Sequence, residues 1–281
     1  MPLHIKGNLK VNSLLLALLF WVGWLVLFIG SYVPFNLFPG LNASAPIQAM
    51  RTGILGTGLA FGVTWAFGKF GKISFKEMGL TWERTTLFRF MGGLLLGTAI
   101  FSILILVLLK FGSMHLIQGT RKIDRWLLIS YLAIIPLALM EEVAFRAYPF
   151  IILHQAFRLR VTQLIVAIAF ALYHVAGGAS LYSAFGGPFV WSFVFGLAAV
   201  QSGGIAVPTG IHVALNALQV FVGMKGSSAA IWKLSLPEGA SQELISHTEH
   251  IGMICQLAVL IIAVLLTEYF IRTKHPRVTN K

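Results

Sequence analysis

Apolar segments recur along the whole chain, and most of them are long enough to cross a lipid bilayer as helices. Of the 281 residues, 57% are hydrophobic and only 11% are charged. That balance excludes an ordinary soluble domain of this size. We predict an all-α, polytopic integral membrane protein with about eight transmembrane helices and no soluble domain. The apolar runs cover residues 12–33, 53–68, 91–109, 126–153, 162–176, 188–200, 205–223 and 251–271.

The basic residues lie mainly in the short connections between these runs. The net charge of +12 would suit nucleic acid, but no patch of aromatic and basic residues accompanies it, so we expect no nucleic-acid partner. Bases in short connections instead set the orientation of a membrane protein. The overall pattern places both termini in the cytoplasm, and we expect a prokaryotic plasma membrane. If every apolar run crosses the membrane, residues 110–125 lie outside the cytoplasm. They nevertheless carry four bases, so this connection conflicts with the rule.

The remaining connections and the cysteine content add few constraints. Residues 35–50 carry no charge and contain prolines, so we predict an irregular, non-cytoplasmic loop. The second apolar run is rich in glycine, which lets helix backbones approach closely in lipid. The single cysteine, Cys255, excludes a disulfide within the chain and any cysteine-based metal site.

Two adjacent glutamates and an arginine interrupt the fourth run, where ionisable side chains are costly and usually functional. On a helix, Glu142 and Arg146 lie one turn apart and should pair, whereas Glu141 points about 100° away and should stay unpaired. Pro149 removes a backbone donor, so we expect the helix to kink or end there. The cluster is either a buried ion network that holds helices together or the setting of a catalytic carboxylate, Glu141.

Three further polar residues stand in the runs that follow. His212 and Asn216 are four residues apart and share a helix face, and His174 follows Phe170 at the same spacing. Counted from the expected cytoplasmic helix ends, Glu141, His174 and His212 lie ~14, ~20 and ~12 Å deep, which allows them to meet in one layer. A carboxylate with a histidine can take a proton from water. A neutral histidine beside an amide can stabilise an oxyanion.

Taken in this order, the segments Glu141-Glu142-x-x-x-Arg146, Phe170-x-x-x-His174 and His212-x-x-x-Asn216 resemble the three motifs of a known family. This is the CAAX-protease and bacteriocin-processing family (CPBP or Abi), whose members are intramembrane glutamic endopeptidases related to the Ras-converting enzyme. The resemblance covers about residues 126–223. It implies that Glu141 and His174 activate the attacking water and that His212 and Asn216 form the oxyanion hole. It also implies a supporting role for Glu142 and Arg146, and Phe170 belongs to the same motifs.

These observations predict one membrane domain over residues 1–281, with a catalytic core at 124–223 flanked by 1–123 and 224–281. We expect no cofactor and no metal. The expected partners are the lipid bilayer and a membrane-associated peptide or protein substrate, of the lipidated CAAX type or a bacteriocin leader as the resemblance implies. Two alternatives stay open. One is a zinc peptidase that uses the same residues as ligands. The other is a non-enzymatic immunity protein, scaffold or transporter.

Overall fold

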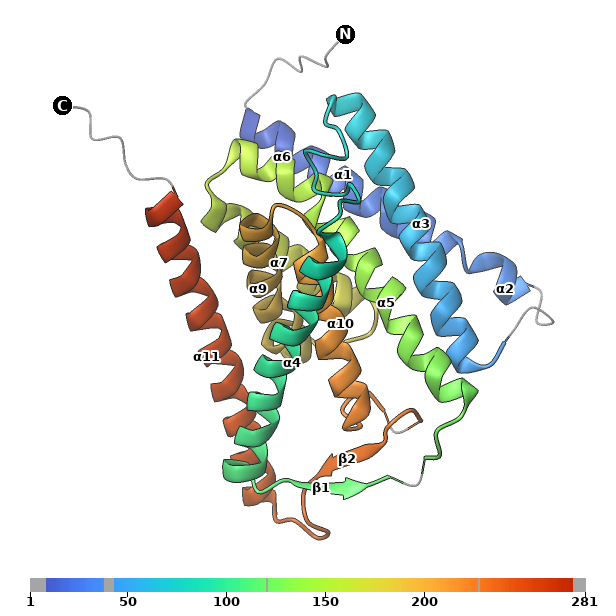
Figure 1. The fold of residues 1–281 in the computed structure, drawn as a ribbon, viewed down its shortest axis with the longest axis vertical. Coiled ribbons are helices and arrows are strands. Elements are labelled where there is room, and N and C mark those ends of the chain that lie inside the picture. The colour runs from blue at the N-terminus through green and yellow to red at the C-terminus, as the bar shows by residue number, and fades with distance from the viewer. Residues whose placement is uncertain (1–8, 38–42, 120, 227, 275–281) are drawn as a thin grey trace.

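The computed structural model describes residues 9–37, 43–119, 121–226 and 228–274, and nearly all of its regular structure is helical (Figure 1). Within these residues, eight helices have 15 residues or more, which confirms the all-α prediction. The helices are α1 (Leu9–Gly30), α2 (Val33–Leu37), α3 (Ala45–Gly71), α4 (Thr86–Phe111), α5 (Arg125–Arg146), α6 (Tyr148–Ala156), α7 (Leu159–Ala176), α8 (Leu181–Gly186), α9 (Pro188–Ser202), α10 (Ala206–Phe221) and α11 (Gln242–Lys274).

Length and apolarity mark six segments of the described chain as able to cross a membrane. They are Leu9–Phe35, Thr86–Phe111, Arg125–Ala156, Leu159–Ala176, Leu181–Ser202 and Gln242–Thr273. The apolar helix α10 is shorter, and the glycine-rich helix α3 is long but does not belong to the six. The protein is therefore a polytopic membrane protein, and the six segments together with α3 and α10 correspond to the eight apolar runs of the sequence.

The long helices run roughly alongside one another and define two ends of the bundle (Figure 1). α1 begins and α11 ends at one end, which we call the terminal end. At the opposite end, the sheet end, two short strands pair: β1 (His115–Gln118) runs antiparallel to β2 (Trp232–Ser235), with His115 opposite Ser235. This sheet ties the connection after α4 to the segment after α10. Nothing in the sequence indicated it.

Glycines set the closest helix contacts. A Cβ atom placed on Gly53 of α3 would lie 2.9 Å from the backbone nitrogen of Leu137 in α5. Between α4 and α10, a Cβ on Gly93 of α4 would lie 2.2 Å from the carbonyl oxygen of Val207, and one on Gly210 of α10 would lie 2.1 Å from that of Phe90. Only hydrogen fits in these places, so α3 packs against α5, and α4 against α10, at backbone distance.

The prediction of an irregular loop over residues 35–50 is wrong at both ends. α2 extends to Leu37, and α3 already begins at Ala45, while residues 38–42 lie outside the described chain. In the sequence, Pro46 suggests a loop. In the structure it occupies the first turn of α3. Backbone N–H groups in the first turn have no acceptor within the helix, so proline loses no hydrogen bond there, and its fixed φ angle is already helical.

Candidate active site

The helix that carries the two glutamates ends where the sequence predicts a break. α5 stops at Arg146, Ala147 leaves the helical region with ψ at −113°, and α6 starts at Tyr148 with Pro149 in its first turn. Glu141, Glu142 and Arg146 therefore occupy the last turns of α5. The buried α5–α6 junction holds these side chains in the interior of the bundle.

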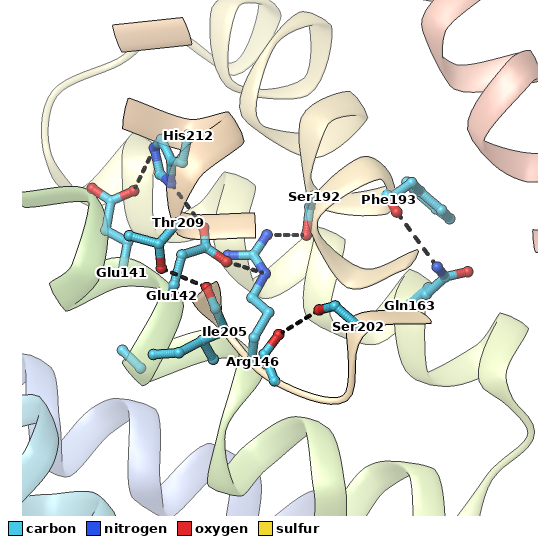
Figure 2. Close-up of polar contacts among 12 residues, drawn as sticks. Glu141, Glu142, Arg146, Gln163, Ser192, Phe193, Ser202, Ile205, Thr209 and His212 are labelled. Carbon is cyan, nitrogen blue, oxygen red and sulfur yellow. Dashed lines mark hydrogen bonds and ion pairs between the residues drawn. The ribbon is translucent and has the colours of Figure 1, made fainter. Parts of the chain in front are cut away.

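Glu142 and Arg146 form the buried ion pair that their spacing predicts. Both side chains are fully buried, and Nε of Arg146 lies 3.5 Å from Oε2 of Glu142. The guanidinium also donates a hydrogen bond of 2.9 Å to Oγ of Ser192 on α9 (Figure 2). Its carbon lies 4.4 Å from the ring centre of Phe170 and 5.1 Å from that of Phe195. The ring centre of Phe145 lies 5.8 Å away, so one hydroxyl and three aromatic rings surround the charge, while Nε and Nη1 have no hydrogen-bond partner among the described residues.

Glu142 has a second partner, which sequence reasoning did not assign to it. Nδ1 of His212 lies 2.8 Å from Oε1 of Glu142 (Figure 2). An ionised carboxylate can only accept, so Nδ1 carries the proton and donates. The ring of Phe195 stacks on the imidazole with 4.7 Å between centres. His212 is thereby fixed with its other nitrogen, Nε2, directed at Glu141.

Glu141 faces two histidines from two different helices. Its Oε2 lies 3.6 Å from Nε2 of His212 and 4.0 Å from Nε2 of His174. The same oxygen is shielded from solvent and has no hydrogen-bond partner among the described residues. Nδ1 of His174 lies 2.8 Å from the carbonyl oxygen of Phe170, which can only accept, so this nitrogen donates. In neutral His174 the Nε2 lone pair therefore points into the site.

Asn216 meets a lysine from beyond the end of its helix. Nζ of Lys225 donates a hydrogen bond of 2.6 Å to Oδ1 of Asn216. Because the amide oxygen is occupied, the amide nitrogen keeps its two N–H groups for another acceptor. The surrounding protein desolvates the Lys225 ammonium and lowers its pKa, although part of the residue is exposed, and the Glu141 carboxylate partly offsets this lowering. Lys225 also lines a cavity of about 490 Å³ at the sheet end.

The structure thus brings Glu141, His174 and His212 together and ties Asn216 to the same region through Lys225. Sequence reasoning missed several contributors. Lys225 lies in the connection after α10, where helix periodicity predicts no contacts. Ser192 and Phe195 belong to an apolar run without charges, in which nothing distinguishes them from core residues. Tyr173, which interacts electrostatically with Glu141, directly precedes a motif histidine but carries no signal of its own. No group of three or more His, Cys, Asp or Glu side chains arranged as metal ligands occurs within the described residues.

Part of the sequence matches a known protein family. No curated protein matches the sequence. Residues 122–218 match the family described as Rce1-like, type II CAAX prenyl endopeptidase Rce1-like. That range contains α5 to α9 and most of α10, and therefore every motif residue, while Lys225 lies just beyond it. The match confirms the resemblance found in the motifs and supports a CAAX-type protease within the membrane. Over residues 122–218, the chain is similar to the Rce1-like family of type II CAAX prenyl endopeptidases.

Proposed function

We propose that the protein is an intramembrane glutamic endopeptidase in which Glu141 and His174 activate water. The observation that carries the proposal is the Oε2 atom of Glu141, buried, without a hydrogen-bond partner among the described residues, and facing two imidazole nitrogens. An unsatisfied buried carboxylate oxygen is costly in a structure that serves stability alone. It is what a general base requires, because a water molecule held there loses its proton directly to the carboxylate.

In the proposed reaction, the water oxygen attacks the carbonyl carbon of the peptide bond while its proton passes to Glu141. His174 accepts a hydrogen bond from the same water at Nε2 and orients it, since Nδ1 is held by the Phe170 carbonyl. The tetrahedral intermediate then collapses, the C–N bond breaks, and Glu141 returns the proton to the leaving amine. The products are a carboxylic acid and an amine, which together contain all atoms of the peptide bond and the water, and Glu141 ends as the carboxylate it began as.

His212 and Asn216 are the proposed donors to the oxyanion. The Lys225 ammonium occupies Oδ1 of Asn216 and leaves its amide nitrogen available. Nε2 of His212 can donate only when the ring is doubly protonated, because Nδ1 already donates to Glu142. In this proposal the donor is therefore the charged ring, whereas the sequence suggests a neutral one. A charged donor is the stronger one for a developing oxyanion.

Glu142, Arg146 and Phe170 have supporting roles in this proposal. Glu142 orients His212 and balances the charge of Arg146, which is anchored in turn by Ser192. Phe170 supplies the carbonyl that fixes His174 and packs its ring edge-to-face against the imidazole at 4.6 Å. None of these three needs to touch the substrate.

The experiment that tests the proposal is product mass spectrometry on a panel of membrane-associated peptides. The panel contains prenylated CAAX-type peptides, the same peptides without the lipid, and bacteriocin leader peptides. We expect the wild-type protein to release a defined fragment from at least one class, and Glu141→Gln to release none. Glu238→Gln, which removes an exposed carboxylate at the sheet end, serves as the matched control and should cleave normally. Equal cleavage by Glu141→Gln would overturn the assignment.

A further inference from the structure

A second cavity lies at the terminal end of the bundle and contains none of the proposed catalytic residues. Its volume is about 760 Å³, within the range of small-molecule sites. Its lining residues come from the end of α6, the start of α7, the end of α9 and the end of α11. Figure 1 shows where these helices lie in the bundle. The activity proposed above gives it no role.

The polar lining of this cavity is entirely basic. Arg158, Arg160 and Arg272 contribute guanidinium groups, and His154 contributes an imidazole. The nearest acid is Glu268 of α11, which forms a two-pronged ion pair with Arg160 of α7. One carboxylate against three guanidinium groups leaves a net positive charge, since the arginines stay protonated. The cavity therefore favours an anion.

The cavity lies at the level where hydrocarbon gives way to lipid headgroups. In α11, residues 251–267 carry no ionisable group other than the thiol of Cys255, and Glu268 is the first charged residue after them. Seventeen helical residues span about 26 Å, close to the thickness of the hydrocarbon core. At the start of α7, the bases Arg158 and Arg160 likewise precede a long uncharged stretch. The ion pair between Arg160 and Glu268 thus marks the membrane boundary on both helices.

The two helices that flank the cavity expose large apolar side chains towards the hydrocarbon. On α11, Leu265 and Tyr269 are 60% and 68% exposed, and on α7, Val161 and Leu164 are 42% and 44% exposed. α9 lies between the helices, with Ala167, Phe193 and Ala263 in one buried cluster. An anionic group seated among the arginines would therefore have an apolar surface below it for attached hydrocarbon chains.

From this arrangement we propose that the cavity is a binding site for the phosphodiester headgroup of an anionic phospholipid. Guanidinium groups bind phosphate oxygens through paired, charge-assisted hydrogen bonds. Arg158 lines the cavity from the start of α7 and Arg272 lines it from the end of α11. The apolar surfaces of α7 and α11 identify the ligand as a lipid rather than a free phosphate. The bound lipid would bridge α7 and α11. Among the described residues, the ion pair of Arg160 with Glu268 is the one that joins these two helices at this level.

Native mass spectrometry of the full-length protein in detergent, titrated with phosphatidylglycerol or phosphatidylcholine, tests this site. We expect phosphatidylglycerol to bind more tightly, and the double variant Arg158→Gln/Arg272→Gln to bind it roughly 30-fold more weakly, since each base contributes about fivefold to binding an anionic surface. The control Lys69→Gln/Arg84→Gln removes two bases from the same end of the bundle, outside the cavity, and should bind like the wild type.

Two further arms keep the outcome decisive. Arg158→Lys/Arg272→Lys preserves the charge and should retain most of the preference for phosphatidylglycerol, which distinguishes loss of the site from misfolding. Glycerol 3-phosphate and inorganic phosphate should fail to displace the lipid. The proposal is overturned if the wild type binds both lipids equally, if the control loses binding as strongly as the double variant, or if free phosphate displaces the lipid at equal concentration.

Discussion

Nδ1 of His212 lies 2.8 Å from Oε1 of Glu142, closer than Nε of Arg146, which lies 3.5 Å from Oε2 of the same carboxylate. The carboxylate between them thus couples the proposed oxyanion donor to the buried cation. Glu142→Gln removes the charge on which both depend. We expect it to lower the free energy of unfolding by roughly 3–5 kcal/mol, because Arg146 remains buried without a counter-charge. Thermal unfolding in detergent measures this loss.

Glu141→Gln should have the opposite profile. It preserves the shape of the side chain and removes the base, so we expect turnover to fall by ~10²–10⁴ while thermal stability stays near that of the wild type. Turnover and unfolding measured on the same preparations separate the two glutamates. If Glu142→Gln abolishes turnover in well-folded protein and Glu141→Gln does not, the two roles are reversed.

Lys225 offers a test of the oxyanion site from outside the motifs. Asn216→Ala removes a proposed donor and should reduce kcat by ~10²–10³, with a smaller effect on KM. Lys225→Met leaves the amide in place but no longer fixes its orientation, so we expect a smaller loss, about tenfold in kcat.

Lys233→Met serves as the matched control, since it removes an exposed lysine of the sheet end that belongs to β2. Its activity should equal that of the wild type. A Lys225→Met protein with full activity would show that Asn216 needs no such anchor.

Metal dependence separates the proposed mechanism from the zinc alternative. We expect activity to survive prolonged treatment with a strong chelator, and the purified protein to contain no stoichiometric zinc. One zinc ion per chain, lost together with activity and restored with it, would instead assign Glu141, His174 and His212 as ligands.

Cysteine labelling tests the orientation in the membrane. Cys255 is first replaced by alanine, and single cysteines are placed at Lys122 and Lys76, both exposed. Gly119, which precedes Lys122 in the same connection, is unsuitable for a cysteine, because a Cβ there would lie 2.9 Å from the carbonyl oxygen of Ile231. With both termini cytoplasmic, an impermeant reagent added outside should label position 122 and leave 76 unlabelled.

Labelling at position 76 from outside, with 122 protected, would invert the orientation. The result also decides access. Lys122 belongs to the connection at the sheet end, so the side on which it reacts is the side from which the cavity beside Lys225 is reached.

Helix periodicity predicted the parts of the site that lie within single helices. The pairing of Glu142 with Arg146 follows from a spacing of four, and the break at Pro149 follows from its missing N–H. Contacts between distant segments follow no such rule. Lys225 reaches Asn216 from beyond the end of α10, and Ser192 reaches Arg146 from a helix without charges. The pairing of β1 with β2 joins segments more than 100 residues apart, and no local pattern specifies their register.

The glycine contact between α4 and α10 limits which amino-acid substitutions this protein tolerates. The residues of α4 are far from any motif in sequence, yet Gly93 and Gly97 press directly on the turns of α10 at Val207 and Ile211, next to His212. A single added methyl group there forces the two backbones apart and displaces the imidazole from its partners on α5. A survey of inactivating mutations should therefore find positions in a helix outside the family match, where a change as small as glycine to alanine abolishes activity in protein that still inserts into the membrane.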